Sequence, residues 1–253
     1  MKKPLLAAAA SLFGLVFVMS PILDLHAAEL KVLAGGSMTG PLNELGPQFE
    51  RASGHKLIIH FDSTPNLIKL ATSAPFDLGV VPVDVFKDAA AKARFASGPT
   101  LDIARVGYGV AVRAGAPKPD VSTPDALKKT LLDAQSIAFL PTSAAGAYVS
   151  SVFERLGIGE AMKVKTKPQT ATGEIAKAVA TGDAELGVFL INVLMAPGVE
   201  LAGPFPAALQ QELVFTAAIA ADTKEVEAAQ AFIAYLKTPA AASVIKARGM
   251  EPG

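Results

Sequence analysis

The stretch Leu33-Ala34-Gly35-Gly36-Ser37-Met38-Thr39-Gly40-Pro41 joins an apolar strand, predicted over residues 30–34, to the start of a helix. Pro41 suits a first helical turn, and the apolar residues that follow it recur at helical spacing. Backbone N–H groups at such a turn point out of the helix N-terminus, at the positive end of its dipole. The stretch therefore predicts an α/β unit whose serine hydroxyl and amides can hold an anion.

The same arrangement recurs three more times. An apolar strand at 56–61 leads into Asp62-Ser63-Thr64-Pro65, where Thr64 is expected to cap a helix that starts at Pro65. A third unit runs from a strand at 136–140 through a turn at 141–146 into a helix that ends at Gly157. Ser63, in the second unit, lies between a strand end and a helix start as Ser37 does, although helix capping alone would also explain either serine.

The fourth unit starts at Lys163–Lys167, whose alternating lysines indicate the solvent-facing side of an edge strand. A turn at 169–174 and a helix that ends at Gly182 complete it. Strands alternate with helices along the whole chain, which predicts an α/β fold with largely parallel sheets.

The other elements follow from the same patterns. Strands are predicted at 77–81, 105–113, 185–191 and 214–221, and helices at 84–95 and 225–236. The Gly- and Pro-rich segment 114–119 ends the longest strand, so we expect the chain to change domains there. The strand at 214–221 would then bring it back.

The 253-residue chain has no Cys, no Trp and balanced charge. Residues 1–28 read as a secretory signal peptide, with Lys2 and Lys3 before an apolar run and small residues before the predicted cleavage near Glu29; a membrane anchor is the alternative. Cleavage would remove Lys2, Lys3 and Asp24 and leave 21 basic and 22 acidic residues. Nothing in this balance favours nucleic acid as a partner, and without Cys there is no disulfide and no lipid-modified cysteine. The mature protein is therefore expected in the periplasm.

Motifs for common chemistry are missing from the sequence. It has no phosphate-binding G-x-x-x-x-G-K-[ST], no G-x-G-x-x-G and no spacing typical of metal ligands. Gly35–Thr39 approaches the nucleophile motif G-x-S-x-G but ends in Thr. Of the histidines outside the leader, His55 falls in a turn and His60 in an apolar strand, where a core role is expected. We therefore expect no enzyme activity, no metal site and no cofactor.

Taken together, these features resemble the molybdate-binding periplasmic proteins of ABC importers over essentially the whole mature chain. The resemblance is carried by Lys31–Thr39, Phe61–Leu67, Ala74–Val80, Gly182–Val188 and Ala231–Ala241. It implies the type II periplasmic binding fold, with two α/β lobes of mixed, mostly parallel sheets and the ligand in the cleft between them. The lobes would comprise residues 29–112 plus 215–253 and residues 113–214.

The resemblance also implies a site of neutral donors. Its two serines fall on Ser37 and Ser63, and its amide-bearing turn residues on Ala145 and Thr172. A family tyrosine falls on Leu190, which has no hydroxyl, so Asn192 is considered as its replacement. The neighbours of these positions complete the set of candidate ligand-binding residues: Met38, Thr64, Gly146 and Gly173.

These observations predict a monomeric periplasmic solute-binding protein that delivers a small anion, molybdate or tungstate first, to an ABC permease. A small organic carboxylate could use the same donors. Two alternatives from other classes stay open at this point. One is a secreted ligand sensor, and the other is a serine hydrolase, which would need a base within reach of Ser37.

Overall fold

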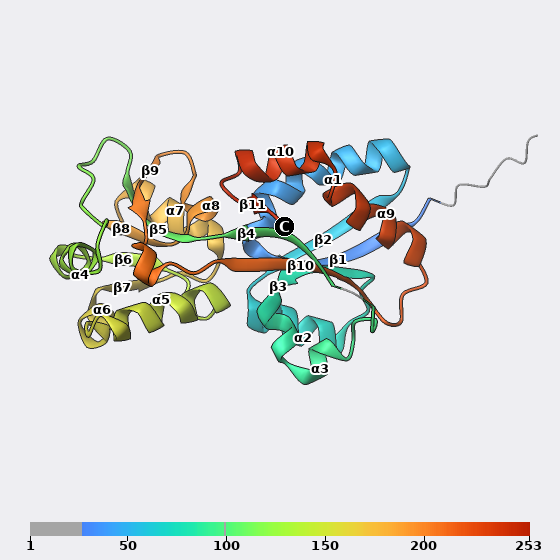
Figure 1. Ribbon diagram of the computed structural model, residues 1–253, viewed down its shortest axis with the longest axis horizontal. Helices are drawn as coiled ribbons and strands as arrows, with labels where there is room; N and C mark the ends of the chain where they lie inside the picture. The colour runs from blue at the N-terminus through green and yellow to red at the C-terminus, as the bar shows by residue number, and fades with distance from the viewer. Residues whose placement is uncertain (1–26, 99) are drawn as a thin grey trace, which may run out of the picture.

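The chain folds into two lobes, each built on one β-sheet with helices packed against it (Figure 1). The computed structural model describes residues 27–98 and 100–253. The predicted signal peptide, residues 1–28, lies almost wholly outside the described residues. In the part of the chain that is described, none of the helices has both the length and the apolarity that a membrane crossing requires.

The first lobe contains a six-stranded sheet in the order β11-β4-β10-β3-β1-β2. Its strands are β1 (Glu29–Gly35), β2 (Lys56–Asp62), β3 (Leu78–Pro82), β4 (Leu101–Val106), β10 (Leu213–Ile219) and β11 (Glu251–Pro252). Its helical segments are η1 (Gly36–Met38), α1 (Thr39–Ser53), α2 (Thr64–Ser73), η2 (Val83–Lys87), α3 (Ala89–Lys92), α9 (Val226–Leu236) and α10 (Pro239–Ala247).

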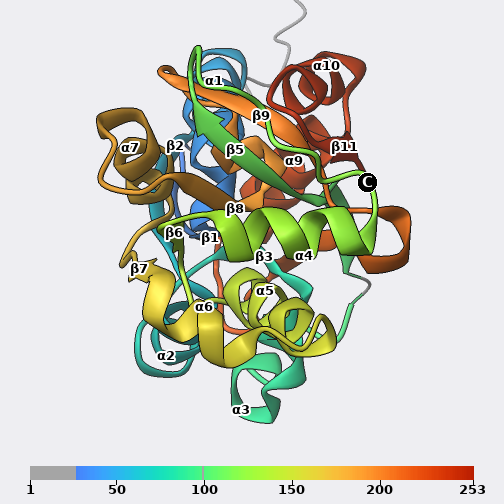
Figure 2. The same ribbon diagram turned by 90° about the vertical axis from the view of Figure 1, so that its left-hand side faces the viewer.

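The second lobe contains a five-stranded sheet in the order β7-β6-β8-β5-β9. Its strands are β5 (Tyr108–Arg113), β6 (Ile137–Phe139), β7 (Thr166–Pro168), β8 (Leu186–Leu190) and β9 (Val199–Pro204). Its helical segments are α4 (Pro124–Asp133), α5 (Ala144–Arg155), α6 (Gly159–Lys165), α7 (Thr172–Thr181), α8 (Ile191–Leu194) and η3 (Ala207–Leu209). Figure 2 looks at the molecule from this lobe, with α4 and α6 in the foreground.

Parallel pairing places the strand ends that matter on one edge of each sheet. β1 pairs in parallel with β2 and β3, and β6 pairs in parallel with β7 and β8. Ligands of open α/β sheets bind outside the carboxyl ends of such strands, where the following helices begin. The predicted α/β, two-lobed fold is confirmed. The remaining five pairs are antiparallel, so the sheets are mixed but not mostly parallel as predicted. β10 runs opposite to β3 and β4, β5 opposite to β8 and β9, and β11 opposite to β4.

Two connections join the lobes, and they lie side by side (Figure 1). The first is Gly107, between β4 and β5, and the second lies between β9 and β10. The single strand predicted at 105–113 is therefore wrong, because its alternating pattern runs through Gly107 although the sheet changes there. The lobes divide at these connections rather than at the predicted limits of 112 and 214. Gln210 ties the connections together, since its side chain accepts from the Tyr108 N–H (2.8 Å) and donates to the Tyr108 carbonyl (2.9 Å).

Other differences from the sequence predictions have local causes. Lys163 and Lys165 belong to α6, and only Thr166–Pro168 forms the edge strand β7, because the preceding residues are good helix formers. The helix predicted at 84–95 is η2 followed by the short α3. His60 is exposed rather than buried, because β2 is itself an edge strand.

Candidate functional site

An inner cavity of about 20 Å³ lies where the two lobes face each other. Segments from both lobes line it: Gly36, Ser37, Asp62, Ser63, Thr64, Pro82, Leu140, Ser143, Ala145, Thr172, Phe189, Leu213 and Phe215. The segment that leads into α1 and the starts of α2, α5 and α7 all reach this cavity. The strand–turn–helix units predicted from the sequence therefore meet in space, two from each lobe.

The cavity offers neutral donors rather than cations. None of its lining residues is Lys, Arg or His. The first N–H groups of a helix have no partner within the helix, and the helix dipole makes that end attractive to an anion. With several helix starts directed at one small space, an anion can be held without a counter-charge.

Ser37 and Ser63 both line the cavity, as predicted. Ser63 occupies the N-cap position of α2, but its side chain makes no capping hydrogen bond. This corrects the expectation that Thr64 caps the helix, because Thr64 is already its first residue. Among the described residues, no hydrogen bond engages the hydroxyl of either serine, so capping does not account for either hydroxyl.

Asp62 places a negative charge on the wall of the inner cavity. Its Oδ1 accepts from the Ser63 N–H (2.7 Å) and from the Asn66 side chain (2.8 Å), and its Oδ2 lies 3.3 Å from His60 Nε2. Burial of the Asp62 carboxyl works to raise its pKa. The hydrogen bonds from Asn66 and the Ser63 N–H outweigh that effect, so the pKa of Asp62 lies below its usual value. Asp62 is therefore an ionised carboxylate, and the Ser63 amide is already taken.

The turn before α5 shows which of the third unit's groups are occupied. Ser143 caps α5, since its hydroxyl accepts from the Gly146 N–H (2.9 Å) and donates to the Leu140 carbonyl (2.9 Å). The amide of Gly146 is thus used within the protein, and Gly146 does not line the cavity. Ala145 does line it, as predicted. Ser143 was missed, although a serine three residues before Gly146 is a capping signal in the sequence.

An outer chamber of about 450 Å³ adjoins the inner cavity and shares Gly36, Ser37 and Thr172 with it. Its further lining residues are Thr39, Gly40, Pro41, Glu44, Gly173, Asn192, Val193, Met195, Ala196, Ala247 and Arg248. Gly173 and Asn192 therefore face this chamber rather than the inner cavity. Arg248 is paired with Glu44 (2.6 Å), so the chamber carries no excess of positive charge from this arginine.

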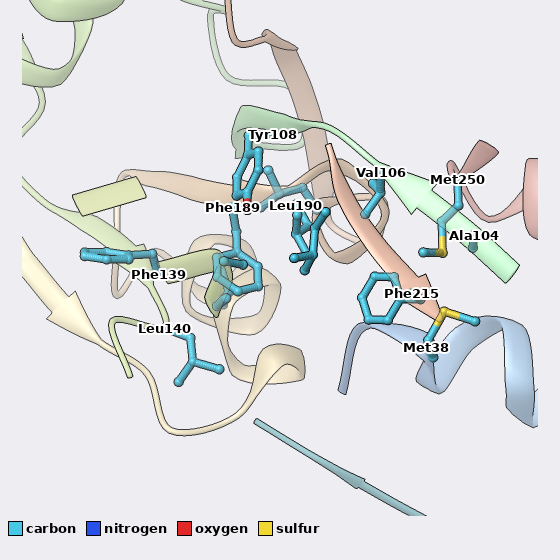
Figure 3. Close-up of a cluster of buried hydrophobic side chains, with 14 of the residues drawn as sticks. Met38, Ala104, Val106, Tyr108, Phe139, Leu140, Phe189, Leu190, Phe215 and Met250 are labelled. Atoms are coloured by element: carbon cyan, nitrogen blue, oxygen red, sulfur yellow. The ribbon is translucent and has the colours of Figure 1, made fainter. Parts of the chain in front are cut away.

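Leu190 and Met38 line neither cavity, which corrects their assignment as ligand-binding residues. Both are fully buried in the hydrophobic core, and Figure 3 shows Leu190 between the side chains of Phe189 and Phe215. It is Phe189, the residue before Leu190, that reaches the inner cavity, together with Phe215 from β10. Successive strand residues point to opposite faces of the sheet. A shift of one position along β8 therefore moves from a residue that lines the cavity to one that packs in the core.

Tyr108 stands opposite Leu190 on the neighbouring strand β5. It packs against Tyr148 and Phe205 and is only 1% exposed. Burial, and then the nearby Asp84 and Tyr148, raise the pKa of its hydroxyl, which therefore stays neutral. This tyrosine does not line either cavity.

The expected hydrolase alternative needs a base near Ser37. No histidine lines the inner cavity or the outer chamber. His55 accepts from the Ala28 N–H (3.2 Å), and His60 contacts Asp62 on the exposed edge of the sheet. No group of three His, Asp or Glu side chains that could hold a metal ion occurs within residues 27–98 and 100–253.

Comparisons with known proteins agree with this architecture. The family profile of bacterial extracellular solute-binding proteins matches residues 30–251. An aconitate isomerase from a Pseudomonas species is 32% identical over 96% of this chain and 95% of its own length. A molybdate-binding protein of Azotobacter vinelandii is 32% identical over 88% of this chain and 90% of its own length.

Among solved structures, a periplasmic molybdate-binding protein of Azotobacter vinelandii has a TM-score of 0.73 at 22% identity, covering 87% of this chain and 98% of its own. That likeness extends to the two-lobed fold. The matched profile spans nearly all of the described residues, and two relatives exceed 30% identity over most of their length. The chain therefore belongs to the bacterial extracellular solute-binding proteins.

Proposed function

We propose that this protein is the periplasmic binding component of an ABC importer and holds a small oxyanion, of the molybdate and tungstate type, in the inner cavity. The observation that carries the proposal is the convergence of four helix starts on one small space, with the hydroxyls of Ser37 and Ser63 left without a partner in the described protein. Ala145 and Thr172 would add donors from the second lobe.

The number of donors around the inner cavity sets the affinity that the site can reach. Each hydrogen bond to a charged group contributes about 1.5–3 kcal/mol, and closure of the lobes with loss of ligand motion costs several kcal/mol. At the upper end of this range, four or five such bonds contribute about 12–15 kcal/mol, and a dissociation constant of about 1 µM is reached once those costs are subtracted. The inner cavity, at about 20 Å³, is far smaller than the pockets of drug-sized ligands, which favours a ligand of few atoms.

The second candidate is a small organic carboxylate, with or without its isomerisation. Two observations favour it: the similarity to an aconitate isomerase, and the apolar wall of Pro82, Leu140, Phe189 and Phe215, which would suit a hydrocarbon body. Isomerisation would need a base, and Asp62 is the one titratable side chain on this cavity's wall. Because its pKa lies below the usual value, Asp62 is a weak base near neutral pH. Binding is therefore favoured over proton transfer.

A panel of ligands decides between these readings. Protein purified from a periplasmic extract is heated with molybdate, tungstate, sulfate, citrate, cis-aconitate or trans-aconitate. A ligand at 100 times its dissociation constant stabilises the fold by about 2.7 kcal/mol, which raises the unfolding temperature by about 5–10 °C. We expect this rise with molybdate and tungstate.

A rise with the carboxylates alone would replace the oxyanion by the second candidate. Absorbance or chromatography of the same aconitate mixtures tests for isomerisation. If none of these compounds changes the unfolding temperature, the proposed site is wrong. Stimulation of a reconstituted cognate permease by the loaded protein would support import, whereas a sensor would bind the ligand without stimulating transport.

A further inference from the structure

The two lobes are joined by a hydrogen bond beside the proposed anion site. The Asn192 side chain, at the start of α8 in the second lobe, donates from Nδ2 to the Ser37 carbonyl in the first lobe at 2.7 Å. The two residues are 155 positions apart in the chain. A second contact between the lobes is weaker, since the Ala144 N–H lies 3.4 Å from Thr64 Oγ1. The bond from Asn192 is thus the shorter of the two.

Ser37 connects this bond to the cavity. Its carbonyl is held by Asn192, while its hydroxyl has no partner among the described residues and its side chain lines the inner cavity. Ser37 lies in the short helical segment η1, which leads directly into α1. A group that holds the Ser37 carbonyl therefore holds the backbone from which the Ser37 side chain extends into the cavity.

The other end of the Asn192 amide shows what this bond costs. Asn192 Oδ1 is buried and has no hydrogen-bond partner within the described residues. Turning the amide over would not help, because Oδ1 would then face the Ser37 carbonyl and two acceptors would meet. Opening the lobes would let water reach Oδ1, so the unpaired acceptor opposes closure while Nδ2 favours it. Because the bond from Nδ2 and the unpaired Oδ1 act in opposite directions, Asn192 alone favours neither the closed nor the open lobes strongly. A ligand in the cavity can then decide between them.

We propose that Asn192 is a positioning residue that couples occupation of the inner cavity to closure of the lobes, and that it does so through Ser37 without touching the anion. This inference rests on the proposed function only for the identity of the ligand. It replaces the role expected from the sequence, in which Asn192 itself would contact the ligand in place of a tyrosine.

The test follows the distance between the lobes. Because the chain has no Cys, the pair Lys69→Cys and Lys177→Cys, on exposed positions of α2 and α7, gives two labelling sites for energy transfer. Asn192→Asp nearly keeps the shape but removes the Nδ2 donor and sets a carboxylate oxygen against the Ser37 carbonyl. Asn43→Asp, at an exposed position of α1, makes the same chemical change away from the lobe contact and serves as the control.

With molybdate we expect high energy transfer in the labelled parent and in Asn43→Asp. In Asn192→Asp we expect lower transfer, and molybdate release about 2- to 10-fold faster in stopped-flow measurements, the effect of one net hydrogen bond. Energy transfer and release that match the parent would overturn the inference, because a mere packing role would change only the unfolding temperature.

Failure of the proposed function gives a different result. The labelled parent would then not respond to molybdate, tungstate or trans-aconitate at all. The hydrogen bond from Asn192 to Ser37 is still tested in that case, because the ligand-free Asn192→Asp protein should show lower energy transfer than the ligand-free parent. Equal transfer in the two ligand-free proteins would then contradict it.

Discussion

The clearest prediction contrasts two serines that line the same cavity but use their hydroxyls differently. Ser63 makes no capping bond, whereas the hydroxyl of Ser143 both accepts from the Gly146 N–H and donates to the Leu140 carbonyl. Ser63→Ala should therefore weaken anion binding and leave the stability of the ligand-free protein nearly unchanged. Ser143→Ala should instead lower the stability of the ligand-free protein, because it removes a helix cap from a buried position.

The magnitudes follow from the bonds. Loss of one hydrogen bond to an anion costs about 1.5–3 kcal/mol, which is a loss of about 10- to 150-fold in affinity for Ser63→Ala. Loss of the Ser143 cap costs about 1–2 kcal/mol, or about 2–8 °C in the unfolding temperature of a chain of this size. Ser37→Ala should behave like Ser63→Ala, since its hydroxyl also has no partner in the described residues.

Isothermal titration with molybdate and tungstate gives the affinities, and urea unfolding without ligand gives the stabilities. The reasoning is refuted if Ser63→Ala loses as much stability as Ser143→Ala while its affinity stays at the value of the unmodified protein. That outcome would mean that the Ser63 hydroxyl caps α2 in solution and does not contact the ligand.

Three further changes test other parts of the site. Leu190→Tyr should lower stability by about 1–3 kcal/mol in urea unfolding through overpacking, because Leu190 is fully buried, and a stable variant that binds molybdate more tightly would contradict the structure. Phe189→Tyr, one residue earlier, should tighten molybdate binding about 2- to 10-fold in titrations by adding a hydroxyl to the cavity wall, whereas weaker binding of molybdate with an unchanged fold would show that the cavity has no room or no oxyanion there. Asp62 has a lowered pKa, so its ionised form stabilises the fold above about pH 4 and this contribution is lost as the pH falls through the folded-state value; Asp62→Asn should flatten the acid side of the stability curve, and an unchanged curve would count against the hydrogen bonds assigned to Asp62.

Local sequence signals were enough to predict the units that form the site. A strand, a small polar turn and a helix start recur at Ser37, Ser63, Ala145 and Thr172, and parallel pairing brings their ends together. These signals work because turn chemistry and helix starts depend on residues close in sequence. The N-cap of α2 was misplaced by one residue, which is the usual uncertainty of a helix boundary.

Contacts between distant segments were beyond the same reasoning. The bond from Asn192 to Ser37 depends on how two lobes meet, and neither residue carries a local signal for it. Phe215 reaches the cavity from β10, the strand that returns to the first lobe, so its role follows from topology alone. The change of sheet at Gly107 was missed because apolar alternation continues on both sides of it.

The end of β8 shows how a single register step alters the chemistry of the wall. Leu190 faces the core and Phe189 faces the cavity, so the positional correspondence with the family tyrosine leads to a core residue. The wall is nevertheless without a hydroxyl at this point, because Phe189 has none either. An oxyanion would then have an apolar ring against one side, and oxygens on that side would lack a donor. The inner cavity should therefore discriminate less strongly between oxyanions than a site with donors on every side, and an anion with one apolar face would lose less at this wall than molybdate does. Titrations of molybdate, sulfate and trans-aconitate against the unmodified protein and Phe189→Tyr measure this directly. The added hydroxyl should lower the dissociation constant of molybdate and raise that of trans-aconitate.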